Sequence, residues 1–370
     1  MIMKNDIMMD YIREQAEIIE RLFRNRKQIV KPVVDHLKKY PVKRIYFSGH
    51  GSPYHVSVIL KPMIEQLLQI EASAETPTLF NNHGAYNVNG VYKKEEMLLI
   101  CPAQSGRTSG PYFSALKAKE LGIPSMCITL REDGKLAELC DIVIKKDSGE
   151  EESFPETKGH MVSVVFLMLA VIEAAHELGK MTDQVYEEYC EKFSELPQAC
   201  LRAADATLKW YEVNKKYFLQ KPNGAVVGYG ENYGTALEGA LKILETSLKM
   251  YAGHECEEYM HGKNQTVTRE SIQFFIYSPS IPSEMERMSR LIKWCRERSE
   301  GCFVLCDSDC ELRDEKAISW KQVRYPYLSA IENHIPFQVI SYMLAESLGL
   351  STIVANHDTA GKELGTRIEE

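Results

Sequence analysis

A strand-to-helix turn of the form G-x-G-x-x-Y occurs twice, once in each half of the chain. The first copy, residues 49–54, follows the apolar run 44–48, and the second copy, residues 228–233, follows the run 224–228. The same motif at the same place in both halves indicates an internal duplication. In each half, short apolar runs alternate with helical segments, which predicts a parallel sheet with helices on both faces. We therefore expect an α/β fold of two three-layer α/β/α sandwiches, each with a parallel sheet of about five strands.

The hydrophobic pattern divides the 370 residues into two α/β domains, a helical segment before the first, a helical connector between them and a tail. Pro41 ends the first helical segment, and Pro197 is expected to break the connector, because proline removes a helix hydrogen bond. The predicted bounds are 1–40 for the N-terminal segment, 41–180 for the first domain, 181–222 for the connector, 223–350 for the second domain and 351–370 for the tail.

Individual elements follow from the period of the apolar residues. The predicted strands are 44–48, 97–102, 125–130 and 141–145 in the first half, and 224–228, 272–277 and 302–305 in the second. The predicted helices are 6–39, 56–68, 111–121, 135–139, 161–178, 181–218, 233–253 and 336–348.

The charge and composition of the chain exclude several classes of protein. The formal net charge is -8 and no basic stripe occurs, so nucleic acid is not an expected partner. No apolar stretch approaches about 18 uncharged residues, so no membrane span is expected, and polar residues interrupt the N-terminus too early for a signal peptide. The ten cysteines are therefore expected to be reduced thiols of a cytoplasmic protein.

Neither a metal nor a cofactor is expected. Cys302, Cys306 and Cys310 are separated by three residues each, which matches no zinc pattern, and the first two lie on a predicted buried strand. A nicotinamide site is not expected either, because the dinucleotide fingerprint needs a third glycine where Tyr54 stands.

Residues 103–108, Ala-Gln-Ser-Gly-Arg-Thr, lie between a predicted strand and a predicted helix. Loops at the carboxyl ends of parallel strands bind ligands, and a helix N-terminus offers unpaired N–H groups to an anion. Gly106 lets the backbone approach the anion closely, and Gln104, Ser105 and Thr108 add side-chain donors. The loop predicts a site for a phosphate monoester; the alternative is that Ser105 and Thr108 only cap the helix.

The second half has no counterpart of this loop, since residues 277–280 stand in its place, but it carries charged residues at helical spacing. Glu238, Lys242 and Glu245 recur at i, i+4 and i+7 and share one helix face. The alternative is a solvated Glu–Lys stripe, which stabilises a helix only slightly. Gly253 is expected to cap this helix at its C-terminus. A separate stripe, expected to be buried, consists of Leu237, Leu241, Leu244 and Leu248.

These motifs together resemble the SIS (sugar isomerase) domain family over roughly residues 41–350, which implies two tandem SIS domains. The loop 103–108 is similar to the family's S-Q-S-G-x-T with Ala103 in place of serine, and residues 156–158 are similar to its S-T-K loop with Glu156 in place of serine. Residues 228–262 resemble the isomerase half of glucosamine-6-phosphate synthase in A-L-E-G-A-L-K, in Glu245 and in the E-x-x-H-G that contains His261. They are also similar to fructoselysine-6-phosphate deglycases.

The resemblance implies a role for each matched residue. Glu245 would be the base that moves a proton between C1 and C2 of an open-chain sugar phosphate, and Lys242 would stabilise oxyanion charge. His261 would open the sugar ring and, as in the resembling enzymes, would come from a partner subunit, which implies a homodimer with shared sites. The residues matched to the binding of the sugar 6-phosphate are Gly51, Ser52, Gln104, Ser105, Gly106 and Thr108.

Several activities stay open. The chain starts M-I-M-K-N-D, without room for the synthase's glutaminase domain, so isomerase, deaminase and deglycase chemistry are the expected choices. A non-catalytic phosphosugar sensor is the alternative of another class, and the presence of Glu245 and His261 speaks against it. Relatives place a C-terminal lysine at the sugar, but Lys362 cannot be aligned with it.

The acidic segment 149–156 bears on the substrate. Its four carboxylates would repel a phosphate dianion, whereas Glu156 in place of a neutral serine could bind an ammonium group. The segment therefore predicts an amine-bearing substrate, either an amino-sugar phosphate or a phosphorylated sugar–amine adduct. The alternative is a solvated acidic loop.

Overall fold

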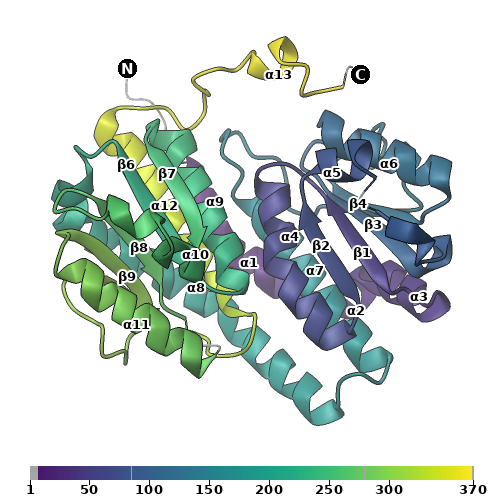
Figure 1. Ribbon diagram of the computed structural model, residues 1–370, viewed down its shortest axis with the longest axis horizontal. Coiled ribbons are helices and arrows are strands. Elements are labelled where there is room, and N and C mark those ends of the chain that lie inside the picture. Colours follow the sequence, from purple (N-terminus) through teal and green to yellow (C-terminus); the bar gives the residue numbers. More distant parts are fainter. Residues whose placement is uncertain (1–6, 85, 279–280, 369–370) are drawn as a thin grey trace. The chain divides into compact units, whose positions relative to one another are not determined.

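The computed structural model describes residues 7–84, 86–278 and 281–368, which form two compact units with one sheet each (Figure 1). The first-sheet unit comprises the described residues of Arg21–Glu150, Lys158–Tyr189 and Asn356–Glu370. The second-sheet unit comprises those of Met1–Glu20, Glu151–Thr157 and Cys190–Ala355.

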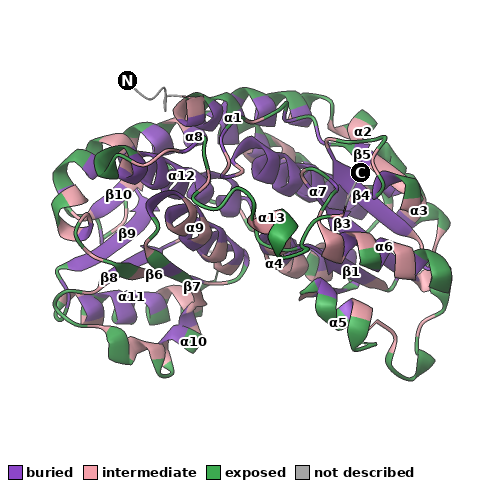
Figure 2. Cartoon of the chain, turned by 90° about the horizontal axis from the view of Figure 1, so that it is seen from above, coloured by how far each residue is buried: buried purple, intermediate pink, exposed green. Residues whose placement is uncertain are grey.

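The first sheet has five parallel strands in the order β2-β1-β3-β4-β5. Every residue of β3 and β4 is buried, as expected for central strands covered on both faces, and Figure 2 colours these strands purple. The bounds are β1 (Arg44–Ser48), β2 (Glu71–Glu75), β3 (Met97–Pro102), β4 (Ser125–Thr129) and β5 (Ile142–Lys145).

The other elements of the first-sheet unit are helices and helical turns. The bounds are α2 (Arg26–Ile29), α3 (Lys31–Lys39), α4 (Ser52–Met63), α5 (Pro77–Asn82), α6 (Ser109–Leu121), α7 (Lys158–Glu177) and α13 (Ala360–Glu363), with the π-helix η1 (Ile64–Leu68) and the 3₁₀ turns η2 (Val88–Gly90), η3 (Lys94–Glu96) and η4 (Ala137–Leu139). Among the described helices, α7 alone has the length and composition to cross a membrane, but 94 % of its most apolar stretch is buried inside the protein, as in a core helix. Two long helices, α1 (Ile7–Arg24) and α8 (Asp183–Phe218), contribute residues to both units.

The second sheet repeats this topology. Its five parallel strands have the order β10-β9-β8-β6-β7, so its first strand again lies between the second and third. The strand bounds are β6 (Asn223–Gly228), β7 (Met250–Glu255), β8 (Ile272–Ile276), β9 (Gly301–Asp307) and β10 (Ala317–Trp320). The helix bounds are α9 (Glu231–Ser247), α10 (Cys256–Met260), η5 (Lys263–Thr266), α11 (Pro282–Arg296) and α12 (Ser329–Leu348).

The two turns that suggested a duplication share one backbone conformation. Gly51 has φ 60° and ψ -129°, and Gly230 has φ 51° and ψ -128°. Both values of φ are positive, and an L side chain rarely adopts such a conformation, so each turn needs its second glycine. The predicted fold of two α/β units with five-stranded parallel sheets is confirmed.

Some predicted elements were wrong. The strands β2, β7 and β10 were not predicted, because they lie at sheet edges or near them and lack a continuous apolar run. Pro197 does not break α8, which runs through it. The helix predicted for 233–253 ends at Ser247, with Leu248 at φ 57°, and Gly253 lies in β7 instead of capping a helix.

The cysteines behave as expected. All ten are free thiols, and Cys302 and Cys306 lie buried on β9. Across the described residues no group of three or more histidine, cysteine or carboxylate side chains has the arrangement of a metal site.

Candidate functional site

The buried face of α9 carries charge. Glu238 and Lys242 are each 1 % exposed, whereas Leu237, Leu241 and Leu244 are only half-buried. The expected buried leucine stripe is therefore wrong, and so is the alternative of a solvated Glu–Lys stripe. Small residues on the buried face allow this packing: a Cβ on Gly239 would lie 2.5 Å from the Phe337 ring of α12.

Lys242 forms the centre of the charged cluster. Its Nζ lies 2.7 Å from Glu245 Oε2 and 3.4 Å from Glu238 Oε1. Burial alone would lower the pKa of Lys242, but the carboxylates of Glu238, Glu245 and Glu156 outweigh it and hold the pKa well above the usual value. Lys242 is therefore a charged ammonium group inside the protein.

Glu245 is more exposed than Glu238 and Lys242. Its side chain is 29 % exposed, so it has access to solvent. Burial raises the pKa of Glu245 above the usual 4.5, Lys242 opposes that shift, and Glu238 and Glu156 add to it. A carboxyl group with a raised pKa that is held beside an ammonium has the properties of a general base.

Two glutamates of the acidic segment 149–156, which precedes α7, interact with different groups in the second-sheet unit. Glu151 Oε2 accepts hydrogen bonds from Thr157 N at 2.9 Å and Thr157 Oγ1 at 2.5 Å, so it stabilises the loop. Glu156 is half-buried and acts electrostatically on Lys242 and Glu245. The loop is therefore more than a solvated acidic segment, and the structure brings Glu156 into the charged cluster of α9.

The structure does not bring His261 to Glu245 within one chain. His261 is exposed and follows α10, beyond the carboxyl end of β7. Glu245 lies in the last turn of α9, which runs opposite to β6 and β7 because it connects two parallel strands. Gly253 of β7 packs against Leu237, and from that contact the two chain segments lead in opposite directions to His261 and Glu245.

The loop 103–108 forms the expected strand-to-helix connection in the first-sheet unit. Gly106 has φ 67°, a left-handed conformation that favours glycine, and a Cβ there would lie 3.2 Å from Thr129 Oγ1. Thr108 is the N-cap residue of α6, but its side chain makes no capping hydrogen bond. Ser105 Oγ accepts from Arg107 N at 3.3 Å. The capping alternative therefore fails for Thr108.

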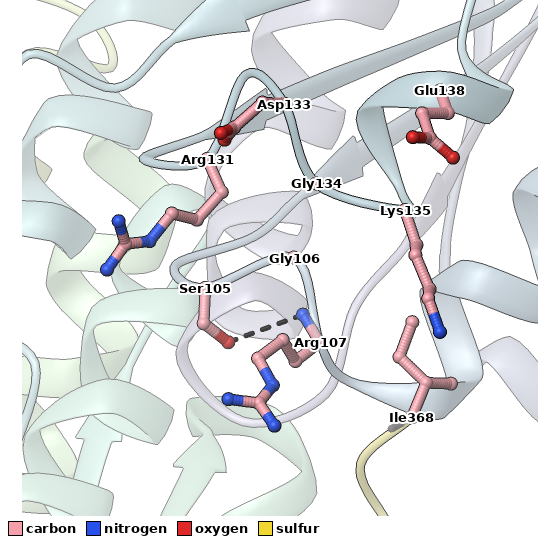
Figure 3. A pocket seen from close by; sticks show the side chains of 9 residues that line it. All are labelled: Ser105, Gly106, Arg107, Arg131, Asp133, Gly134, Lys135, Glu138 and Ile368. Atoms are coloured by element: carbon pink, nitrogen blue, oxygen red, sulfur yellow. Dashed lines mark hydrogen bonds between the residues drawn. The ribbon is translucent and has the colours of Figure 1, made fainter. Parts of the chain in front are cut away.

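A cavity of about 570 Å³ opens beside this loop (Figure 3). Ser105 and Gly106 line it, but Gln104 and Thr108 do not, so the predicted ligands are only partly brought together. In Figure 3 the guanidinium group of Arg107 lies close to the Ser105 hydroxyl, whereas that of Arg131 extends to the left, away from it. The remaining lining residues are Asp133, Gly134, Lys135, Glu138 and Ile368.

The tail contacts the same loop, which the sequence did not predict. Ile368 N donates to Arg107 O at 2.8 Å, and Ser109 N donates to Thr366 O at 3.0 Å. The cations Arg131 and Lys135 were also missed, since they belong to no motif and reach the cavity only through the fold. Of the other predicted ligands, Gly51 forms the turn before α4, and Ser52 is the first residue of α4 and is buried. The segment expected to replace the loop in the second half, 277–280, lies partly outside the described residues.

Comparisons with known proteins agree with this architecture. The SIS domain family matches residues 40–177 and 217–345. A glutamine–fructose-6-phosphate aminotransferase (isomerizing) of Thermococcus kodakarensis is 24 % identical over 345 residues, covering 91 % of this chain and 54 % of its own length. The chain thus spans about half the length of the curated relatives it matches.

Two solved structures show the same fold. The C-terminal domain of glucosamine-fructose-6-phosphate aminotransferase from Francisella tularensis superposes with a TM-score of 0.83 at 21 % identity, covering 93 % of this chain and 97 % of that one. Glucosamine-6-phosphate deaminase from Thermotoga maritima has a TM-score of 0.73 at 21 % identity, with 95 % and 97 % covered. Because the family matches most of the chain in two segments, the chain belongs to the SIS family, as the motifs predicted.

Proposed function

We propose that this SIS protein is an enzyme that transfers a proton between C1 and C2 of an amine-bearing sugar 6-phosphate. The open-chain substrate would react through an enediol or enolamine. One observation carries the proposal: the buried ammonium of Lys242 on α9 forms ion pairs with Glu238 and Glu245, and Glu156 adds a further negative charge that acts on it electrostatically.

Glu245 is the proposed base. Proton abstraction next to a carbonyl needs a carboxylate whose pKa lies close to the working pH, and the pKa of Glu245 is raised in that direction. Its partial exposure allows a substrate carbon to approach. Lys242 stays charged and would stabilise the oxygen on which negative charge develops.

The excess of carboxylates supports the proposed amine. With all four groups ionised, the cluster of Glu156, Glu238, Lys242 and Glu245 carries more negative than positive charge. A neutral ketose would gain nothing from that excess, whereas a substrate ammonium would form a charge-assisted hydrogen bond. The phosphate end is assigned to the loop 103–108, where Gly106 permits a close approach and Ser105 and two arginines line the cavity.

His261 is proposed to act on the substrate bound to a second copy of the chain. Within one chain, α9 and the segment after β7 lead Glu245 and His261 in opposite directions, which favours such sharing. Leu248 and Met250, which are 55 % and 69 % exposed, are proposed to belong to the dimer contact. Mixing the separately inactive variants Glu245→Gln and His261→Ala should restore part of the activity. A mixture that stays as inactive as either variant alone would contradict shared sites.

The test of the proposed function is a panel of phosphosugars with and without an amine at C1 or C2. We expect turnover of an amine-bearing member, and Glu156→Gln should raise its apparent Kd by about tenfold, equivalent to about 1.4 kcal/mol. The same change should leave fructose 6-phosphate nearly unaffected. Equal loss for both ligands would favour plain aldose–ketose isomerisation, and tight binding without turnover of any member would favour a sensor.

A further inference from the structure

Lys146 lies buried behind the loop 103–108 in the first-sheet unit. It follows β5 directly and is 1 % exposed. Its Nζ donates to Gln104 Oε1 at 2.9 Å, and its backbone N donates to Thr129 O at 2.8 Å. A lysine seldom lies inside a protein unless it binds a particular partner, because its charge must be removed from water.

The contacts of Gln104 show what this hydrogen bond does. The main-chain O of Gln104 accepts from Leu130 N at 3.1 Å and Thr129 Oγ1 at 3.3 Å, and its Oε1 accepts from Lys146. Each acceptor group of Gln104 is therefore occupied. In the described part of the chain, no residue accepts a hydrogen bond from Gln104 Nε2.

The chemistry of the two side chains fixes the orientation of the amide. An ammonium group has three donors and no acceptor, so Lys146 can bind only the oxygen end of Gln104. A phosphate is an acceptor and needs donors around it. An amide rotated by half a turn would present its oxygen to the anion and repel it.

We propose that Lys146 is a positioning residue for substrate phosphate, which locks the Gln104 amide so that its N–H donors face the anion. This inference rests on the proposed assignment of phosphate to the loop 103–108 itself, since Gln104 does not line the cavity beside the loop. Because Ala103 lacks the hydroxyl of the family's serine, this chain has one donor fewer in the loop, and the orientation of the neighbouring Gln104 amide gains weight.

The first measurement compares two adjacent lysines. Lys146→Met should raise the Kd for inorganic phosphate and the KM for the turned-over sugar phosphate by about tenfold, with kcat little changed. Lys145→Met is the matched control, because Lys145 is exposed on β5, where its Nζ lies 3.8 Å from Glu132. Its phosphate affinity should stay within about twofold of the parent. An unchanged Kd for Lys146→Met, or equal losses for both variants, would overturn the inference.

A double-mutant cycle separates positioning from a general structural role. In a Gln104→Ala background, Lys146→Met should have little further effect on phosphate affinity, since the amide that it orients is gone. An undiminished loss would show that Lys146 acts independently of Gln104 and would contradict the inference. Lys146→Arg, which keeps a donor and the charge, should recover part of the affinity.

A third variant keeps the inference testable if Lys146→Met does not fold. Gln104→Glu retains a partner for Lys146 but removes the N–H donors, so the affinity for inorganic phosphate should fall at least as far. Unchanged affinity would refute the positioning role. Failure of the proposed function is distinguishable, because a chain that turns over no phosphosugar can still show Lys146-dependent phosphate binding.

Discussion

The two sheets share a topology and a turn but place their polar groups differently. Counted from the turn glycine, Glu238, Lys242 and Glu245 in the second-sheet unit correspond to Ile59, Met63 and Gln66 in the first. Ile59 and Met63 are fully buried, as Glu238 and Lys242 nearly are. The same buried helix position therefore holds an apolar side chain in one unit and a charged one in the other.

In the loop after the third strand, the polar groups belong to the first-sheet unit instead. In the first-sheet unit it contains Gly106 in a left-handed conformation, Ser105 on a cavity and Gln104 held by Lys146. The second-sheet unit has residues 277–280 there, without the S-Q-S-G-x-T pattern. Fold alone therefore does not specify function: each duplicate holds its polar groups at a different point of one scaffold.

The largest expected effect tests this division on the helix after the first strand. Glu245→Gln should lower kcat by about 10²- to 10⁴-fold, because it removes the proposed base while keeping the side-chain shape. Phosphate binding should persist. Gln66→Glu, at the equivalent point of the first-sheet unit, is the control and should leave kcat unchanged. Steady-state kinetics measures kcat for both variants. A similar loss of kcat in the two would contradict the assignment of the base to the second-sheet unit alone.

A smaller effect is expected at the loop of the first-sheet unit. Thr108→Val keeps the side-chain volume but removes a hydroxyl that makes no capping hydrogen bond. The affinity for the sugar 6-phosphate should fall by about tenfold, or about 1.4 kcal/mol, while that for the unphosphorylated sugar should hardly change. Calorimetric titration measures the affinity for each sugar. Equal losses for the phosphorylated and unphosphorylated sugars would show that the loop does not bind the phosphate.

The pH dependence of the rate tests how the charges of the α9 cluster act on Glu245. The proposed mechanism requires Glu245 as a carboxylate, so we expect its raised pKa to place the acidic limb of the rate profile above the usual 4.5. Glu238→Gln removes a negative charge that raises this pKa, and the limb should therefore move to lower pH by up to about one unit. A limb that moves upward would show that the charge of Glu238 acts in the opposite sense.

The smallest contrast concerns the shared turn. Gly51→Ala and Gly230→Ala should each cost about 1–2 kcal/mol of unfolding free energy, because both glycines have the same positive φ. Denaturant unfolding of the two variants checks this. Costs that differ severalfold would mean that the turns, alike in backbone, are constrained differently by their surroundings.

The sequence by itself determined the architecture. Central strands such as β3 and β9 are continuous apolar runs, and the glycine turns are short local signals, so pattern and spacing were sufficient to predict them. The charged residues at i, i+4 and i+7 and the loop 103–108 were visible for the same reason: each lies within one helix or one turn.

Only the tertiary structure decided which face of α9 is buried. Leucines on one face and glycine, alanine and charged residues on another leave both choices open locally. The buried face was settled by α12, whose Phe337 needs the space beside Gly239. The electrostatic effect of Glu156 on the α9 cluster and the hydrogen bond of Lys146 to Gln104 join residues that are distant in sequence, so no local period encodes them. The edge strands β2 and β7 likewise depend on their pairing with β1 and β6.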